Sequence, residues 1–333
     1  MIVVTIYTTK TDNGIEDLLQ GLRMMEESIP NRVVMIDIES DNAFFEAYKG
    51  ITPVVQIGPY QIKSPFTMQE IRVAMGATQD RAAHLEKVGD DSYSRRIKHG
   101  SCFSRVDNIS YWLSKHYMIL FNLFFFLYTS FPFAAPVLLK NGYETPANAI
   151  YSVYGALCHE LAFRSWFLFG EQAFYPRSLA GIDGVKSYEM VTGSDVISVD
   201  FARTFTGNET LGYKVALCQR DIGIYGSIFL FGVIFSITGR KIKPISWYWW
   251  LIIGLTPIAI DGVSQLPGII TNLFPDWIPI RESTPLLRTL TGGLFGTFTA
   301  WYLYPLIEES MAEIRSLLYR KKLVVNQSQV ENS

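Results

Sequence analysis

Four side chains that can ligate a metal ion occur in two short segments of this sequence. Cys158 and His159 are adjacent, and Cys218 and Asp221 lie within one helical turn of each other. Two thiolates, an imidazole and a carboxylate make a tetrahedral ligand set of the kind that binds zinc. The adjacent pair departs from the usual C-x-x-C spacing, so two other interpretations stay open. One is a disulfide between Cys158 and Cys218 on an oxidising side of a membrane, and the other is a pair of buried cysteines that pack as small hydrophobic side chains.

Four arginines accompany these residues, and two interpretations of them are open. They can form salt bridges with nearby carboxylates, which buried charges require. Alternatively they can bind an anion or a phosphate, because guanidinium groups pair with such groups through two parallel hydrogen bonds. Asp261 and Gln265 are four residues apart, so they share one helix face that we expect to point into a helical bundle. The arginines are Arg164, Arg220, Arg281 and Arg288, and the acidic partners are Glu160, Asp221, Asp261 and Glu282.

Most apolar residues lie in the part of the chain that contains these candidates. Hydrophobic residues make up 49% of the sequence and charged residues 18%, compared with about 25% charged residues in a typical soluble domain. After about Lys115, four segments are long and apolar enough to cross the roughly 30 Å of membrane hydrocarbon. These predicted spans are residues 117–139, 222–238, 247–266 and 286–307.

A further apolar segment, residues 147–169, carries charged side chains in its middle, which are costly at membrane depth unless they face protein or water. Basic residues flank the chain before residue 117, in the loop 239–243 and in residues 315–322. The positive-inside rule places all three on the cytoplasmic side. Four spans satisfy this rule with 147–169 as a re-entrant or interfacial segment, whereas five spans would place one basic cluster outside. We therefore predict a multi-pass plasma-membrane protein with cytoplasmic N- and C-termini and its polar residues at the extracytoplasmic face.

The first 78 residues read as a soluble α/β domain with the element order βαβαββα. The expected strands are residues 2–7, 33–38, 54–57 and 60–62, and the expected helices are residues 15–29, 42–48 and 67–75. This order, with Thr52-Pro53 before the third strand, resembles the glutaredoxin-like branch of the thioredoxin fold. The resemblance implies that Pro53 is a cis-proline beside the active-site loop and that a C-x-x-C follows the first strand. Residues 8–14 contain no cysteine, so we expect a redox-inert structural or docking module, with a protein partner bound beside Pro53.

Five motifs in the second part of the chain resemble domain-of-unknown-function family 2085, an uncharacterised family of prokaryotic membrane proteins. The resemblance covers roughly residues 117–307 and carries no established activity. A long insertion, residues 170–217, separates the two cysteine motifs, and we expect it to form an extracytoplasmic loop. The motifs are C-H-x(4)-R-S at Cys158-His159 with Arg164-Ser165, C-x-R-[CD]-x-G-x-Y at 218–225, D-G-x-x-Q at 261–265, R-E-S at 281–283 and R-x-x-T-G at 288–292.

The predicted architecture is an α/β thioredoxin-like soluble domain followed by an all-α transmembrane helical bundle. Residues 1–78 form the soluble domain, 79–116 a basic linker and juxtamembrane segment, 117–307 the membrane domain and 308–333 a cytoplasmic tail. The tail after Lys322 is polar, so we expect it to be disordered.

Three functional hypotheses follow. The first is a membrane protein with an extracytoplasmic zinc site that acts on a lipid-linked or anionic substrate, with zinc activating water and Glu160 or Asp261 as general base. The second is a non-enzymatic membrane scaffold or accessory subunit whose N-terminal domain docks a partner. The third, a transporter, is disfavoured because four spans show no visible repeat. We expect contact with membrane lipid, and the net charge of −2 gives no basic field for nucleic acid.

Overall fold

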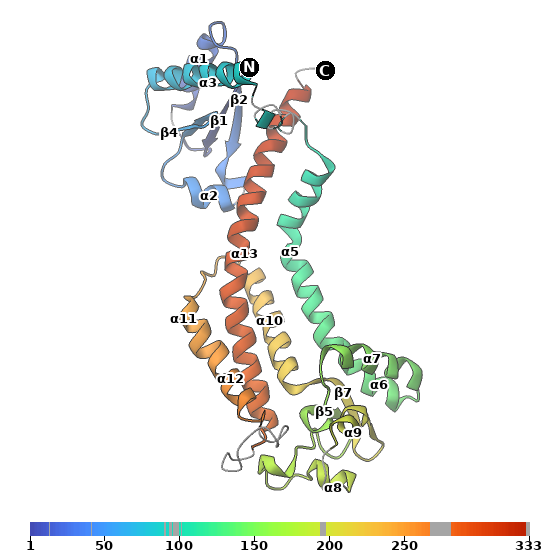
Figure 1. Cartoon of the computed structure of the whole chain (residues 1–333). Helices are drawn as coiled ribbons and strands as arrows, with labels where there is room; N and C mark the ends of the chain where they lie inside the picture. The colour runs from blue at the N-terminus through green and yellow to red at the C-terminus, as the bar shows by residue number, and fades with distance from the viewer. Residues whose placement is uncertain are drawn as a thin grey trace. The chain divides into compact units, whose positions relative to one another are not determined.

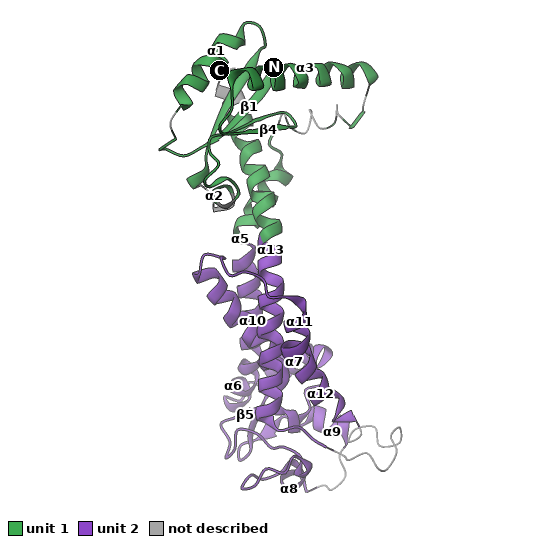
Figure 2. Cartoon of the chain, turned by 90° about the vertical axis from the view of Figure 1, so that its left-hand side faces the viewer, with its two compact units in different colours: residues 1–116, 309–333 green, residues 117–308 purple. Residues whose placement is uncertain are grey.

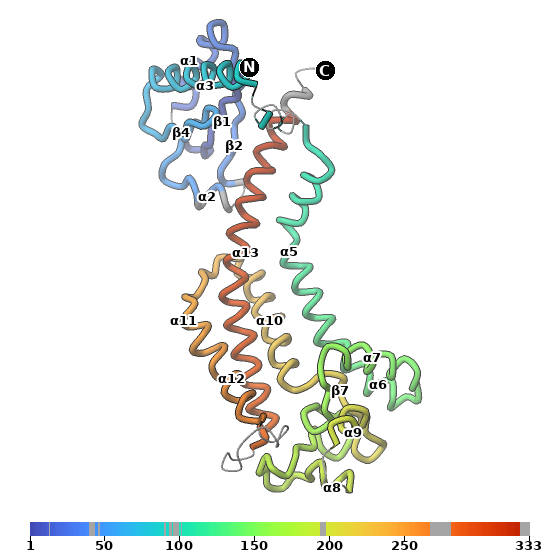
Figure 3. The backbone as a smooth tube through the Cα atoms, viewed as in Figure 1, coloured from blue at the N-terminus to red at the C-terminus, as the bar shows by residue number. Residues whose placement is uncertain are grey.

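The structure of the chain is a computed structural model. It describes all residues except 13, 41, 90, 93, 94, 96–99, 101, 194–197, 267–280 and 331–333. The described chain, traced in Figure 3, divides into two compact units. One contains residues 1–116 and 309–333, and the other contains residues 117–308 (Figure 2).

The first unit contains a mixed α/β region in which the predicted order of elements is present. Strands β1 (Ile2–Thr8), β2 (Asn31–Asp37), β3 (Val54–Ile57) and β4 (Tyr60–Lys63) form one sheet in the order β2-β1-β3-β4. The β1–β2 pair is parallel and the other two pairs are antiparallel. The helices are α1 (Ile15–Glu26), α2 (Asn42–Tyr48) and α3 (Met68–Val88).

Helix α3 extends beyond its predicted end at residue 75 into the expected linker. It begins with a capping box between Thr67 and Glu70 and ends at Gly89, which adopts a left-handed conformation. The residues between are mostly good helix formers, so their polar composition does not interrupt the helix. The sequence change after residue 78 therefore marks the exposed end of a helix.

The two faces of this sheet are covered by different parts of the chain. Helices α1 and α3 pack against one face through an apolar core that includes Leu22 and Met75. The opposite face, which includes Val34 and Ile36, contacts α2 and the end of the long helix α13 (Pro285–Val330). The α13 side chains in this second core are Tyr319, Leu323 and Val324.

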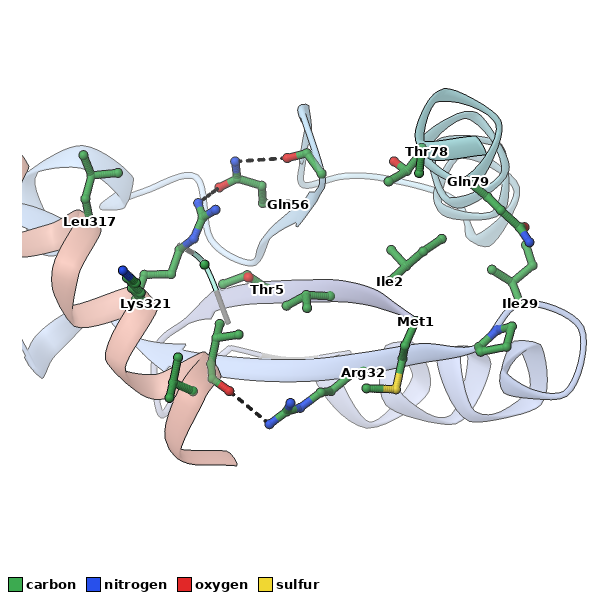
Figure 4. Close-up of a pocket in the computed structure, with 18 of the residues that line it drawn as sticks. Met1, Ile2, Thr5, Ile29, Arg32, Gln56, Thr78, Gln79, Leu317 and Lys321 are labelled. Carbon is green, nitrogen blue, oxygen red and sulfur yellow. Dashed lines mark hydrogen bonds between the residues drawn. The ribbon is translucent and has the colours of Figure 1, made fainter. Parts of the chain in front are cut away.

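The helical end of α13 corrects the expectation that the tail after Lys322 is disordered. Leu323 and Val324 pack against the sheet, which gives the polar tail an apolar anchor and holds it helical to Val330. Two hydrogen bonds add to this packing, from Arg320 to Gln56 at 2.9 Å and from Arg32 to the Val324 carbonyl at 3.1 Å. A cavity of about 1070 Å³ lies beside these bonds (Figure 4).

The second unit contains most of the apolar helices. They are α5 (Arg105–Ser130), which begins in the first unit, α6 (Ala134–Lys140), α7 (Glu144–Leu157), α10 (Gln219–Ile237), α11 (Trp247–Trp249) and α12 (Thr256–Val263), with the first half of α13 (Figure 1). A π-helical turn, Trp250–Leu255, joins α11 to α12. Pro257 lies in the first turn of α12 and cannot donate a backbone hydrogen bond.

Two helical segments in the described part of the chain are long and apolar enough to cross a membrane. They are Arg105–Lys140 and Gln219–Ile237, which correspond to the predicted spans 117–139 and 222–238. The predicted span 247–266 corresponds to a shorter apolar helix, Trp247–Val263. The predicted span 286–307 is the first half of α13. Helix α13 is not one of the two segments that meet this length and hydropathy criterion.

Residues 147–169 do not form a continuous apolar helix. They contain most of α7, a 3₁₀ turn (Ala162–Arg164) and strand β5 (Ser165–Leu168). The sequence expected as a loop, 170–217, supplies helices α8 (Tyr188–Thr192) and α9 (Val199–Thr204) and strands β6 (Gly207–Asn208) and β7 (Gly212–Cys218). Strand β7 pairs antiparallel with β5 and β6. The two segments therefore fold together, because they share a buried core of Phe163, Phe167, Tyr175, Tyr188 and Leu211.

Helices α10 and α13 touch through their backbones at three glycines. A Cβ atom at Gly223 would lie 2.5 Å from the Thr289 carbonyl oxygen. A Cβ atom at Gly292 would clash with the Arg220 carbonyl, and one at Gly296 with the Ile224 carbonyl. Arg220 lies against Gly292 and Ile224 against Gly296, four residues further along each helix, so the two helices run parallel (Figure 1).

We predict that Gly292→Ala destabilises the protein and that Gly293→Ala does not. The added methyl group at residue 292 meets backbone, so we expect a loss of about 1–3 kcal/mol in the free energy of unfolding. A Cβ atom at Gly293 has its nearest neighbour at 4.0 Å, and alanine favours the helix by about 1 kcal/mol. Thermal unfolding of both variants in detergent measures this difference, and equal melting temperatures would contradict it.

Candidate functional site

The register of the small sheet brings two sequence motifs together. Ser165 in β5 pairs with Cys218 in β7. Arg164 immediately precedes Ser165 and Arg220 comes two residues after Cys218, so both arginines lie at the same end of this sheet. Gln219, which is fully buried, donates a hydrogen bond of 3.0 Å to the Ser165 carbonyl. Helix α10 begins at this residue. Strand pairing thus places the start of α10 against the segment that follows α7.

The two cysteines lie at facing helix ends. Cys158 is the C-cap of α7, and Cys218 is the N-cap of α10, where its Sγ accepts a hydrogen bond of 3.4 Å from the Asp221 amide. One ligand atom each from Cys158, Cys218 and Asp221 lies within 4.8 Å of the other two. We call these three half-buried residues the thiol–carboxylate group. His159, the fourth predicted ligand, is exposed and lies outside this group.

Both cysteines of the group are free thiols in this structure. Hydrogen bonding to Cys158 and burial raise the pKa of Cys218 well above its usual value. Cys218 therefore carries its proton at neutral pH in the absence of a cation. Cys158 also packs against an apolar core that contains Ile150, Tyr154 and Leu217, as a cysteine that acts as a small hydrophobic side chain does.

Glu282 is the centre of a first set of ion pairs. It is 3% exposed and accepts two hydrogen bonds from Arg164, of 3.0 Å to Oε1 and 3.2 Å to Oε2. Arg288, which is also buried, donates to Oε1. Arg177 places its Nη1 atom 3.6 Å from Oε2. One carboxylate is therefore shared by three guanidinium groups.

Asp261 is the centre of a second set. It is 3% exposed, and its carboxylate lies 2.5 Å from Arg220 and 3.4 Å from Arg281. Gln265 donates to the Asp261 carboxylate at 3.3 Å and accepts a hydrogen bond of 2.9 Å from Arg288. The Gln265 amide therefore joins the two sets into a single arginine cluster.

The arginine cluster contains all four arginines that the sequence singled out and one that it did not. Arg177 lies in the segment predicted to be a loop and belongs to no motif, so no local signal marked it. It also lies 3.8 Å from Glu189.

Burial and the like charge of Arg220 lower the pKa of Arg164 to about 10. Among the described residues, five guanidinium groups face three carboxylates, which is a surplus of two positive charges.

Glu160 forms a separate buried ion pair with Lys214. The two residues are 2% and 1% exposed, and Lys214 Nζ lies 3.9 Å from Glu160 Oε2. Lys214 also donates to the carbonyls of Glu160 and Arg203, at 2.9 and 2.7 Å. Burial raises the pKa of Glu160, against the opposing effect of Lys214 and Arg203, and lowers the pKa of Lys214. Both candidate general bases, Glu160 and Asp261, are therefore held in ion pairs.

We predict that Lys214→Met strongly destabilises the protein, whereas Lys186→Met has little effect. Removing Lys214 leaves a buried carboxylate without a counter-charge, which costs about 3–5 kcal/mol. Lys186 pairs with Glu171 at 2.5 Å, but both side chains are about half exposed, and such pairs contribute less than about 1 kcal/mol. Denaturant unfolding in detergent measures the two losses. Similar losses for both variants would show that the buried Glu160–Lys214 pair does not stabilise the sheet formed by β5, β7 and β6.

The loop after β1 contains a carboxylate where the glutaredoxin-like pattern has thiols. Asp12 accepts hydrogen bonds from the Thr9 amide at 2.8 Å and from the hydroxyls of Thr8 and Thr52, both at 3.1 Å. Burial opposes ionisation, but these hydrogen bonds lower the pKa of Asp12 below its usual value. The Thr52–Pro53 peptide bond is cis. Asp12 thus ties the loop to the residue before Pro53.

Comparison with known proteins supports a membrane protein of unknown function. Residues 200–302 match the family described as predicted membrane protein (DUF2085). The chain is also 26% identical over 204 residues to an uncharacterized protein of Methanocaldococcus jannaschii. The aligned region covers 59% of this chain and 96% of the relative. No solved structure matches.

The family match confirms part of the predicted resemblance. It contains Cys218, Asp261 and the arginines at 220, 281 and 288, but it begins after Cys158 and Arg164. The first cysteine motif is therefore joined to the matched region by the structure, through the pairing of β5 with β7.

Proposed function

We propose that this chain is a multi-span membrane protein that binds zinc at Cys158, Cys218 and Asp221. The observation that carries the proposal is the separation of at most 4.8 Å between their ligand atoms. Ligand atoms around a tetrahedral zinc ion lie about 3.3–3.8 Å apart, so small side-chain rotations would complete the site. Three protein ligands would leave a fourth position for water or substrate, where zinc would supply Lewis acidity. In this proposal His159 is not a ligand.

The proposed topology has four spans, residues 117–139, 222–238, 247–266 and 286–307, with both termini in the cytoplasm. The basic flanks of these segments support it. Exposed apolar side chains on the third and fourth segments support it further, because a membrane would cover them. They are Ile252, Ile260, Val263, Leu286, Leu290 and Leu303. The thiol–carboxylate group and the arginine cluster would then lie on the extracytoplasmic side.

We predict opposite labelling of two single-cysteine variants by a membrane-impermeant maleimide added to intact cells. The chain has 3 cysteines, and replacing Cys158 and Cys218 with alanine leaves Cys102, which precedes the first span and should be protected. Glu209→Cys in a chain without native cysteines places an exposed thiol in the 170–217 segment, which should be labelled. Lysed cells provide the control in which both react. Labelling of Cys102 in intact cells would overturn the topology.

We also propose that the N-terminal domain is thioredoxin-like, redox-inert and used to dock a partner protein. Its strand order, its cis Thr52–Pro53 bond and the absence of cysteine before Cys102 support this proposal. One observation favours a second candidate function, a non-enzymatic membrane scaffold. Every carboxylate of the arginine cluster is already paired with an arginine, as a structural network requires.

We predict about one zinc ion per purified protein molecule, lost in the variants of the three proposed ligands. Elemental analysis of Cys158→Ser, Cys218→Ser and Asp221→Asn should show a large loss of zinc with a lower melting temperature, because a bound metal stabilises the folded state. Cys102→Ser and His159→Ala are the matched controls and should retain zinc. If the wild-type protein holds no stoichiometric metal and Cys158 is oxidised to Cys218, the disulfide interpretation replaces this proposal.

A further inference from the structure

We propose that the arginine cluster binds the phosphate group of an anionic membrane lipid. The cluster consists of Arg164, Arg177, Arg220, Arg281 and Arg288 with the carboxylates Asp261, Glu282 and Glu189. This inference rests on the proposed membrane location and names the anionic group that the site would receive. It does not depend on a bound metal ion.

The first argument is the charge balance. Within the described part of the chain, the five guanidinium groups exceed the three carboxylates by two, and counting Asp221 of the neighbouring thiol–carboxylate group leaves an excess of one positive charge. Asp261, Glu282 and Arg288 are almost fully buried, so water screens this charge poorly. Buried charge is stable only when it is paired. The cluster therefore favours an additional anion.

The second argument is the direction of the helices. Arg220 lies in the first turn of α10 and Arg288 in the first turn of α13. These helices run parallel and in backbone contact, with Arg220 against Gly292, so α13 begins seven residues before this contact and α10 one residue before it, and both positive helix ends point toward the same end of the pair. Each N-terminus corresponds to about half an elementary charge, and such ends bind phosphate.

One guanidinium group is available to receive the anion. Arg220 Nε is buried and has no hydrogen-bond partner among the described residues, although Nη2 of the same side chain contacts Asp261. Arg281 is the most accessible member, with 41% of its side chain exposed. A phosphate can bridge two guanidinium groups with charge-assisted hydrogen bonds, which are short and strong.

The third argument identifies the source of the phosphate. The helices that carry Asp261 and Arg288 also expose large apolar side chains within one turn of them: Ile260 and Val263 on α12, and Leu286 and Leu290 on α13. Surface of this kind fits lipid chains, whereas a freely dissolved phosphate would not contact it. Apolar surface beside a cationic cluster has the two-part character of a phospholipid. The structure therefore favours a lipid phosphate over free phosphate.

We test this with the full chain in mixed micelles that contain either phosphatidylglycerol or phosphatidylcholine. We expect phosphatidylglycerol to raise the melting temperature more than phosphatidylcholine does. Arg281→Gln should raise the half-saturating mole fraction of phosphatidylglycerol roughly tenfold, the loss expected for a contact with a charged group. Arg281 is the least buried member, so this variant should keep the fold. The matched control is Arg240→Gln, which removes a cation outside the cluster, paired with Glu308.

Three results would overturn the lipid assignment. Equal stabilisation by both lipids would exclude recognition of the anionic group, and equal loss of affinity in Arg281→Gln and Arg240→Gln would indicate general charge attraction. Stabilisation by inorganic phosphate alone, without a further effect of phosphatidylglycerol, would assign the cluster to a soluble anion. Zinc content measured in the same preparations separates the proposals, because loss of zinc in Cys218→Ser with unchanged lipid binding would leave this inference standing.

Discussion

The backbone contact between α10 and α13 is the constraint on which the polar centre depends. Gly223, Gly292 and Gly296 allow the two helices to approach closely, and this approach places Arg220 and Arg288 at the same end of the pair. Two positive helix ends and two arginines repel one another. Asp261 and Glu282, both almost fully buried, supply the opposing charge from neighbouring segments. The arginine cluster is therefore a requirement of this helix packing as well as a candidate binding site.

The small sheet supplies the second part of the centre. Pairing of β5 with β7 places the end of α7 near the start of α10, so that Cys158 and Cys218 face each other as helix caps. The buried Glu160–Lys214 pair lies beside this junction. Glu160 is a non-glycine residue with a positive φ of 46°. Its buried pairing with Lys214 explains why it keeps this backbone conformation.

Residue patterns alone predicted much of this arrangement, and physical reasons account for the rest. Short runs of β-branched and apolar residues were sufficient to predict the four N-terminal strands, and the motif arginines do meet. The segment 147–169 was predicted to be re-entrant or interfacial, and strand β5 within it was not predicted because a four-residue strand is too short to show a period. His159 was included because it adjoins Cys158, but Cys158 has extended backbone angles, and successive side chains of an extended chain point in opposite directions. Arg177 and the helical tail depend on tertiary contacts that have no local signature.

The π-helical turn Trp250–Leu255 sets the rotation of the helix that follows it. Each residue advances an α-helix by about 100°, so deleting one residue from this turn would move every later side chain by that angle. Asp261 would then occupy the place of Ile260, whose side chain is exposed, and Gly262, which has no side chain, would replace Asp261 against Arg220. A change in the length of this turn would therefore rotate Asp261 away from the buried face of α12. The number of residues between the aromatic segment at 247–250 and Asp261 is therefore as strongly constrained as the aspartate itself.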